Sequence, residues 1–346
     1  MGTGRKMEKR KIRQNCIVFA SLAALLLLVF CLSLSMGSVS IPAGDVFSYL
    51  FGGSGDEQHV KIIREIRLPR ATLALFSGGA LAISGYLLQT FFRNPIAGPF
   101  VLGISSGARF AACVLMVIVA GQGFTVSNAE MVGWSFAGAM LATGIILLLS
   151  FQIKSMGILL VAGFMVSYIM SALTDFLISF ADDASIINLH GWTLGSFSGT
   201  APADAAQAAV LVAIVSVIVF CLSKPIGAYQ SGERFAETVG VHVRLLQLSI
   251  IILSSLLSGV VTAFAGPVSF VGVAVPFIVR TILKDRRPLV MIPALFLCGA
   301  VFTLVSDLLA RMLLSPMELS LSTVTSVIGA PLVLIMMVGR KKEREL

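Results

Sequence analysis

The apolar and polar positions of this chain form a series of long apolar runs separated by mostly short polar connections. A helix needs about 20 mostly apolar residues to cross a bilayer. Ten runs approach that length, at residues 16–36, 71–91, 99–120, 131–151, 156–179, 204–222, 246–265, 268–283, 289–311 and 321–339. The pattern predicts an all-α, polytopic membrane protein with about ten transmembrane helices in a single domain, residues 16–339.

The basic residues are spread unevenly over the connections between these runs. Most of the 25 Lys and Arg residues fall in the tails at 1–15 and 340–346, in the 223–245 loop, or in connections on the same predicted side. Because Lys and Arg accumulate on the cytoplasmic side of membrane proteins, both tails and this loop are predicted to be cytoplasmic. The basic start also fits a signal peptide, but the long apolar run without a clear cleavage site favours an uncleaved span.

The composition supports a membrane protein and argues against several function classes. The chain is 57% hydrophobic and only 12% charged, against about 25% charged in soluble domains. The net charge of +8 is explained by orientation in the membrane, so nucleic acid is not an expected partner. The five Cys and three His show no metal-site spacing, and no phosphate-binding loop is found. We therefore expect no metal, no cofactor and no catalytic residues, with ATP hydrolysis left to another chain.

Several motifs follow one another in a fixed order along the chain. They are Ile66–Arg70, Phe92–Pro99, Leu102–Ala108, Gly191–Gly199, Gly232–Val241, Ala265–Gly272, Asp307–Arg311 and Glu318–Pro331. Over residues 60–335 this order resembles the FecCD-type permeases, which belong to ATP-binding-cassette (ABC) importers for iron-siderophores, haem and cobalamin. The resemblance implies a type II ABC importer permease in the cytoplasmic membrane. It favours an iron-siderophore or a related large metal chelate as substrate, with haem or cobalamin as the alternative.

The same resemblance implies partners and functional residues. The partners are a second permease subunit, expected to be an identical copy, two ATPase subunits and an extracytoplasmic substrate-binding protein. Gly232, Glu233, Arg234, Ala236 and Gly240 match the short helix that couples the permease to the ATPase, and Glu233→Pro is expected to break this helix. Arg67, Arg70 and Arg311 match arginines at which the binding protein docks. Met156 and Gly157 lie at the positions of a gate in the family and are possible residues of the translocation path. Arg109 is a further possible path residue, not from the resemblance but from its depth in the third span. At that depth it either snorkels or pairs with a carboxylate, or it faces the path.

Two other function classes stay open on the residues alone. An ion-coupled secondary transporter needs acidic groups within the membrane, for which Asp175 and Asp307 are the candidates. Asp307, however, lies one helical turn before Arg311, and an i,i+4 ion pair is the simpler interpretation. A membrane enzyme is not supported by any catalytic constellation. Finally, residues 77–85 and 258–266 weakly resemble each other, five spans apart, which suggests an inverted repeat.

Overall fold

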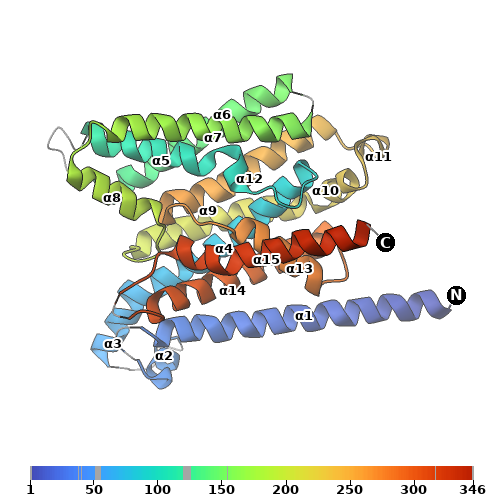
Figure 1. Ribbon diagram of the computed structural model, residues 1–346. Coiled ribbons are helices and arrows are strands. Elements are labelled where there is room, and N and C mark those ends of the chain that lie inside the picture. The colour runs from blue at the N-terminus through green and yellow to red at the C-terminus, as the bar shows by residue number, and fades with distance from the viewer. Residues whose placement is uncertain are drawn as a thin grey trace.

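The computed structural model describes residues 2–37, 39, 41–50, 56–119, 126–153, 155–315 and 317–344, and this part of the chain contains helices and no strand. The α-helices are α1 Gly2–Ser35, α2 Ala43–Leu50, α3 Glu57–Ile62, α4 Leu68–Phe91, α5 Ile104–Val114, α6 Asn128–Gln152, α7 Met156–Ile178, α8 Asp183–Thr193, α9 Pro202–Cys221, α10 Ser223–Gln230, α11 Glu233–Thr238, α12 Val243–Ala265, α13 Val271–Ile282, α14 Pro288–Met312 and α15 Leu321–Arg344. Two π-helical segments, Ile63–Arg67 and Leu115–Val119, and the 3₁₀ turn Pro99–Leu102 complete the set. The long helices form one elongated bundle (Figure 1).

Each of the ten predicted apolar runs falls on a helix or on a group of helical segments. Seven helices in the described part of the chain are long and apolar enough to cross a membrane: Arg13–Ser35, Glu57–Phe91, Asn128–Gln152, Met156–Ile178, Pro202–Cys221, Val243–Ala265 and Pro288–Met312. The other three runs contain the shorter apolar helices Ile104–Val117, Val271–Ile282 and Leu321–Ile335. The all-α, polytopic prediction is confirmed.

The third and eighth predicted runs are not continuous helices, which corrects the prediction for 99–120 and 268–283. Gly103 and Phe270, just before α5 and α13, have φ angles of 69° and 63°. A residue in this left-handed region cannot continue a right-handed helix. The 12 residues of α13 extend for only about 18 Å at 1.5 Å per residue. Irregular backbone therefore completes both segments, which is tolerated at membrane depth where protein surrounds it.

These two interruptions occupy equivalent places in the two halves of the chain. α5 follows α4 and α13 follows α12, and α4 and α12 carry the weakly similar stretches 77–85 and 258–266. α4 and α12 also run in opposite directions through the bundle (Figure 1). Matched broken helices in two oppositely directed halves are typical of inverted-repeat transporters, so the structure favours the repeat.

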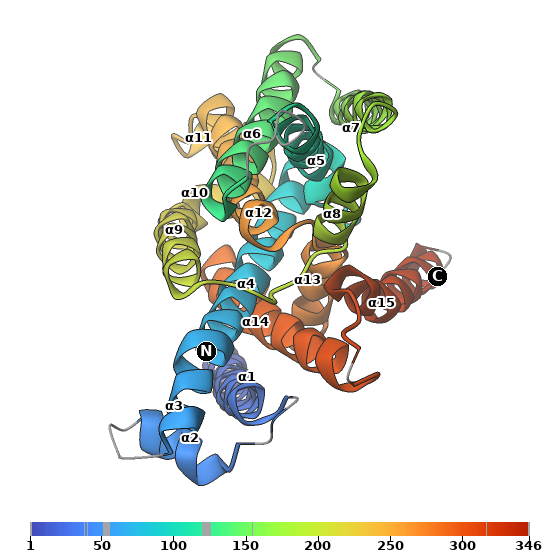
Figure 2. The ribbon, with the colours of Figure 1, turned by 90° about the vertical axis from the view of Figure 1, so that its left-hand side faces the viewer.

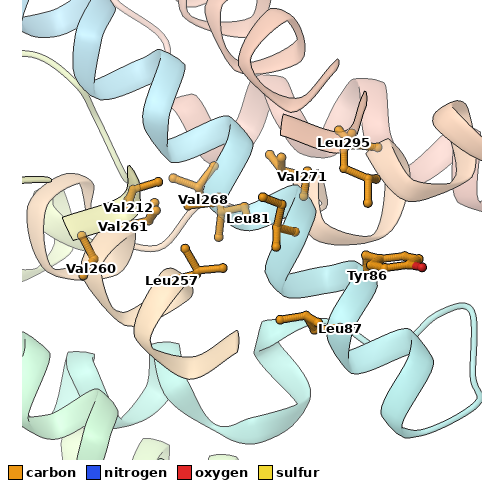
Figure 3. Packing of buried hydrophobic residues seen from close by; sticks show 14 of the residues in the cluster. Leu81, Tyr86, Leu87, Val212, Leu257, Val260, Val261, Val268, Val271 and Leu295 are labelled. Carbon is orange, nitrogen blue, oxygen red and sulfur yellow. The ribbon is translucent and has the colours of Figure 1, made fainter. Parts of the chain in front are cut away.

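α4 lies at the centre of the molecule, between α9, α12, α13 and α14 (Figure 2). Its most apolar window is 83% buried, whereas the corresponding windows of α1 and α7 are 22% buried. Leu81 and Leu87 of α4 lie in one cluster of buried side chains with Leu257 of α12, Val271 of α13 and Leu295 of α14 (Figure 3). The hydrophobic core thus surrounds α4, while α1 and α7 lie at the periphery.

Glycines allow α4 to approach two neighbouring helices at backbone distance. A Cβ atom on Gly78 would collide with the backbone of Gly299 in α14, and one on Gly85 would collide with the backbone of Gly272 in α13. Small residues at such crossings let membrane helices pack closely, since lipid supplies no hydrophobic force between them. The positions of α13 and α14 against α4 therefore depend on these glycines.

The bundle has two distinct ends. The start of α1, the end of α15, α10 and α11 lie at one end, which we call the tail end, and α2, α3 and α8 lie at the distal end (Figure 1). The segment predicted as a separate tail, 1–15, continues α1 as helix from Gly2. Lys, Arg, Glu and Met are good helix formers, so the helix extends beyond its apolar part.

Candidate coupling, docking and pathway sites

The predicted coupling segment at the tail end is a pair of short helices, α10 and α11. Gly232 joins them with a φ of 128°, and Gly240 ends the second with a φ of 85°. Both angles lie in a region that side-chain-bearing residues rarely adopt, which explains glycine at these two positions. Ala236 is buried and its carbonyl accepts a 2.9 Å hydrogen bond from the Val241 backbone N–H. The predicted helical stretch is therefore present, held in place by tight turns at both ends.

The outer face of α11 is exposed and partly apolar. Phe235 and Val239 are 51% and 54% exposed. Arg234, directly before Phe235, is exposed as well. On the inner side, Glu233 forms a 3.0 Å ion pair with Arg93, which lies in the loop after α4. α11 thus exposes two apolar side chains and a basic one at the tail end.

The first turn of α11 corrects one expectation. Glu233 is the first residue of this helix, after Gly232 at the N-cap. Proline is tolerated at a first helical position, because its missing N–H would have no helical acceptor there. The expectation that Glu233→Pro breaks the helix is therefore wrong. Ala236 is the position to use, since its N–H donates to the Gly232 carbonyl at 2.9 Å.

Arg67, Arg70 and Arg311 come together at the distal end, but their side chains point into the protein. The Arg70 guanidinium lies 2.9 Å from the Asp307 carboxylate and 3.0 Å from that of Glu318. Arg311 pairs with Asp307 at 3.2 Å, one helical turn away. The i,i+4 pair expected for Asp307 is confirmed. We call these five residues the distal charge cluster.

Arg67 is attached to the backbone rather than to a carboxylate. Its guanidinium donates to the Leu34 carbonyl at 2.7 Å and to the Val39 carbonyl. Leu34 lies in the last turn of α1, where carbonyls have no helical donor. Arg67 therefore closes the end of α1, and Arg311 adds a 2.9 Å hydrogen bond to Ser33 in the same turn.

The distal charge cluster contains more positive than negative groups. Three guanidinium groups face two carboxylates, which leaves one positive charge without a carboxylate inside the cluster. Arg67 and Arg70 are only 5% and 7% exposed, whereas the Glu318 side chain is 44% exposed. Glu318 is thus the most exposed carboxylate of the cluster. Glu318 and Arg93 both fall within the sequence motifs, but neither contact follows from the sequence, because both partners lie far away in the chain.

The possible path residues do not form one site. Arg109 of α5 lies 3.8 Å from Asp175 of α7, and the two side chains are 36% and 69% exposed. Met156 lines a small pocket of about 60 Å³ beside Arg244 and Phe151 near the tail end. Gly157 lies next to it and is exposed. The predicted carboxylate partner of Arg109 is present, whereas Met156 and Gly157 lie near the start of the same helix, α7, apart from this pair.

The described residues contain no group of His, Cys, Asp or Glu that could hold a metal ion. What the geometry does provide is a mostly apolar bundle with ionic contacts at its two ends.

Comparison with known proteins identifies the family. Residues 25–339 match the FecCD transport family. This chain belongs to the FecCD transport family. It is 33% identical over 331 residues to the vitamin B12 import system permease protein BtuC of Salmonella typhi, covering 93% of this chain and 95% of that protein. The BtuC protein of Citrobacter koseri is also 33% identical, over 92% of this chain and 93% of that protein.

Solved structures agree with this assignment. A metal-chelate type ABC transporter in an inward-facing conformation superimposes with a TM-score of 0.81 and 26% identity, over 94% of this chain and 99% of that chain. PsaBC from Streptococcus pneumoniae, solved with a Fab, gives a TM-score of 0.54 at 14% identity, over 84% of this chain and 94% of that chain, and supports the fold alone. The FecCD protein described here is the multi-pass, membrane-embedded permease of a bacterial ABC importer, a transport subunit that works with an ATPase and a binding protein.

Proposed function

We propose that this permease carries a large metal chelate into the cell, as a pair of identical subunits with two copies of a separate ATPase subunit and one extracytoplasmic binding protein. The observation that supports it is the match to the family over residues 25–339. A ferric siderophore is the first substrate to test and cobalamin the second, since the BtuC relatives import vitamin B12. Haem is the third, from the same resemblance.

The proposal is tested by reconstitution. The permease is co-expressed with a candidate ATPase subunit from the same organism, purified and placed in liposomes with a candidate binding protein. We expect ATP-dependent uptake of one of the three chelates, and no uptake without the ATPase. Uptake driven by an ion gradient in the absence of ATPase would contradict the proposal and favour a secondary transporter.

In this proposal the tail end faces the cytoplasm and α11 binds the ATPase. The exposed Phe235 and Val239 support this role, together with the basic residues that gather at the same end. Cysteine labelling from outside intact cells tests the orientation. A cysteine placed at Thr238 should stay unlabelled, and one at Asp183, at the start of α8, should react.

The distal charge cluster is proposed as the docking site of the binding protein. Its surplus positive charge supports this, since an incoming carboxylate can be held by a guanidinium through two hydrogen bonds. Because Glu318 already holds Arg70 in this way, it competes with a docking carboxylate. We expect Glu318→Gln to strengthen docking, measured as the Kd of the binding protein at low and high salt. The matched control is Glu65→Gln, an exposed glutamate at the same end, which should change the Kd much less. An unchanged Kd in Glu318→Gln would place docking elsewhere.

Arg109 is proposed to face the translocation path in the assembled importer. Charged groups facing lipid at this depth cost several kcal/mol, yet both Arg109 and Asp175 are accessible on the single chain. A water-filled path between two subunits would remove that cost. Arg109→Gln should lower uptake of anionic chelates more than that of neutral ones, and an equal loss for both would leave only a structural role.

A further inference from the structure

A polar pocket of about 300 Å³ opens at the tail end, where α4, α10, α13 and α14 meet. It is lined by Tyr86, Gln89, Thr90, Arg93, Tyr229, Gln230, Arg280, Arg286 and Met291. Three of these side chains are arginines, and its described lining contains no carboxylate. We propose that this pocket binds a phosphate-bearing anion, the headgroup of an anionic phospholipid.

Two of the arginines are held in position by aromatic rings. The Arg280 guanidinium carbon lies 6.0 Å from the centre of the Tyr86 ring, and that of Arg93 lies 5.6 Å from the centre of the Tyr229 ring. Such stacking orients a guanidinium without using its N–H donors. One N–H of Arg93 donates to Glu233 at 3.0 Å. Arginine suits phosphate because its planar fork matches two phosphate oxygens.

The wall of the pocket is ordered by neutral hydrogen bonds. The Gln230 amide donates to the Tyr86 hydroxyl at 2.8 Å and to the Thr90 hydroxyl at 3.1 Å. Burial raises the pKa of the Tyr229 phenol, so this hydroxyl stays protonated and adds no negative charge. Arg93 has a φ of 49°, a conformation that costs energy in a residue with a side chain. The three arginines are thus the only charged side chains in the described lining of the pocket.

The position of the pocket favours a lipid over a free anion. It lies where α4 ends and α14 begins, at the boundary of the apolar spans, which is the depth of lipid phosphates. Two large apolar residues, each two positions from a lining residue in sequence, are exposed: Ile282 by 47% and Leu289 by 49%. Acyl chains would cover these side chains while the phosphate enters the pocket. Basic pockets between transmembrane helices on the cytoplasmic side bind lipid headgroups in this way.

The test measures thermal unfolding of the purified full-length chain in detergent while lipid is added. Dioleoyl-phosphatidylglycerol should raise the Tm in a saturable manner, and dioleoyl-phosphatidylcholine should not. Arg286→Gln should weaken the apparent affinity for phosphatidylglycerol about tenfold or more, the loss typical of a charged hydrogen bond. Arg280→Gln should act in the same direction. Arg286 is the deciding position, because it lies exposed in the loop between α13 and α14 and its replacement leaves the fold intact.

Lys284→Gln is the matched control. Lys284 is exposed in the same loop, loses the same charge and does not line the pocket. Its affinity for phosphatidylglycerol should stay within about twofold of the unchanged protein, as expected for a screened surface charge. Equal effects of both lipids, or equal losses in Arg286→Gln and Lys284→Gln, would overturn the proposal. A third arm uses inorganic phosphate and glycerol 3-phosphate. If these alone reproduce the Arg286-dependent shift, the pocket takes a soluble phosphate and the lipid source is wrong.

Discussion

Asp307→Asn removes one negative charge from the distal charge cluster while keeping the shape of the side chain. Asp307 is 1% exposed and accepts from Arg70 at 2.9 Å and from Arg311 at 3.2 Å. With asparagine in its place, the cluster keeps three guanidinium groups but only one carboxylate, that of Glu318. Removing one partner of a buried ion pair costs about 3–5 kcal/mol, because the remaining charge stays desolvated.

Glu318→Gln provides the comparison within the same cluster. Its side chain is 44% exposed, and exposed ion pairs contribute about 0–1 kcal/mol. The free energy of unfolding is measured in mixed detergent and SDS micelles, followed by the fluorescence of the two tryptophans. We expect Asp307→Asn to be less stable than Glu318→Gln by about 2–4 kcal/mol. Adding Arg311→Gln to Asp307→Asn should recover part of the loss. Equal stability of the two single variants would refute the argument from burial.

Three further predictions concern other parts of the molecule. Ala236→Pro should abolish substrate-stimulated ATP hydrolysis in liposomes without preventing membrane insertion, whereas Glu233→Pro should leave coupling largely intact; the reverse order would contradict the position of α11. Gly85→Ala should destabilise the protein by about 1–3 kcal/mol through overpacking against α13, while Gly144→Ala, which has nothing within 4 Å of the new Cβ, should be neutral or slightly stabilising. Hydrogen bonds from an arginine two residues away hold the pKa of Asp285 below its usual 3.8. The stability it contributes is therefore present above pH 3.8 and lost as the pH falls further, so Asp285→Asn should unfold with a weaker pH dependence below pH 4.

The order of the apolar helices could be read from the sequence, because a run of about 20 apolar residues has few alternatives to a membrane helix. The interruptions at Gly103 and Phe270 could not. Residues 99–120 and 268–283 are mostly apolar, and hydropathy does not report a single left-handed φ angle. The weak similarity between 77–85 and 258–266 did indicate the repeat within which these interruptions are matched.

Among the contacts of the site residues, too, one could be predicted from the sequence and others could not. The i,i+4 spacing of Asp307 and Arg311 was sufficient to predict their ion pair. The contacts of Arg70 with Glu318 and of Arg93 with Glu233 join residues 248 and 140 positions apart, and no local pattern predicts them. The burial of Arg67 was also unexpected, since an arginine that closes the last turn of another helix looks in sequence like any basic residue beside a span.

The glycine contacts of α4 have a mechanical consequence. Where two helices touch backbone to backbone, sliding one past the other requires the backbones to separate first, and packed interfaces switch between discrete arrangements rather than deforming continuously. α4, α13 and α14, joined at Gly85–Gly272 and Gly78–Gly299, should therefore move as one block during a transport cycle. Opening and closing are left to the loosely packed helices around this block, α7 foremost, with α4 as the fixed axis.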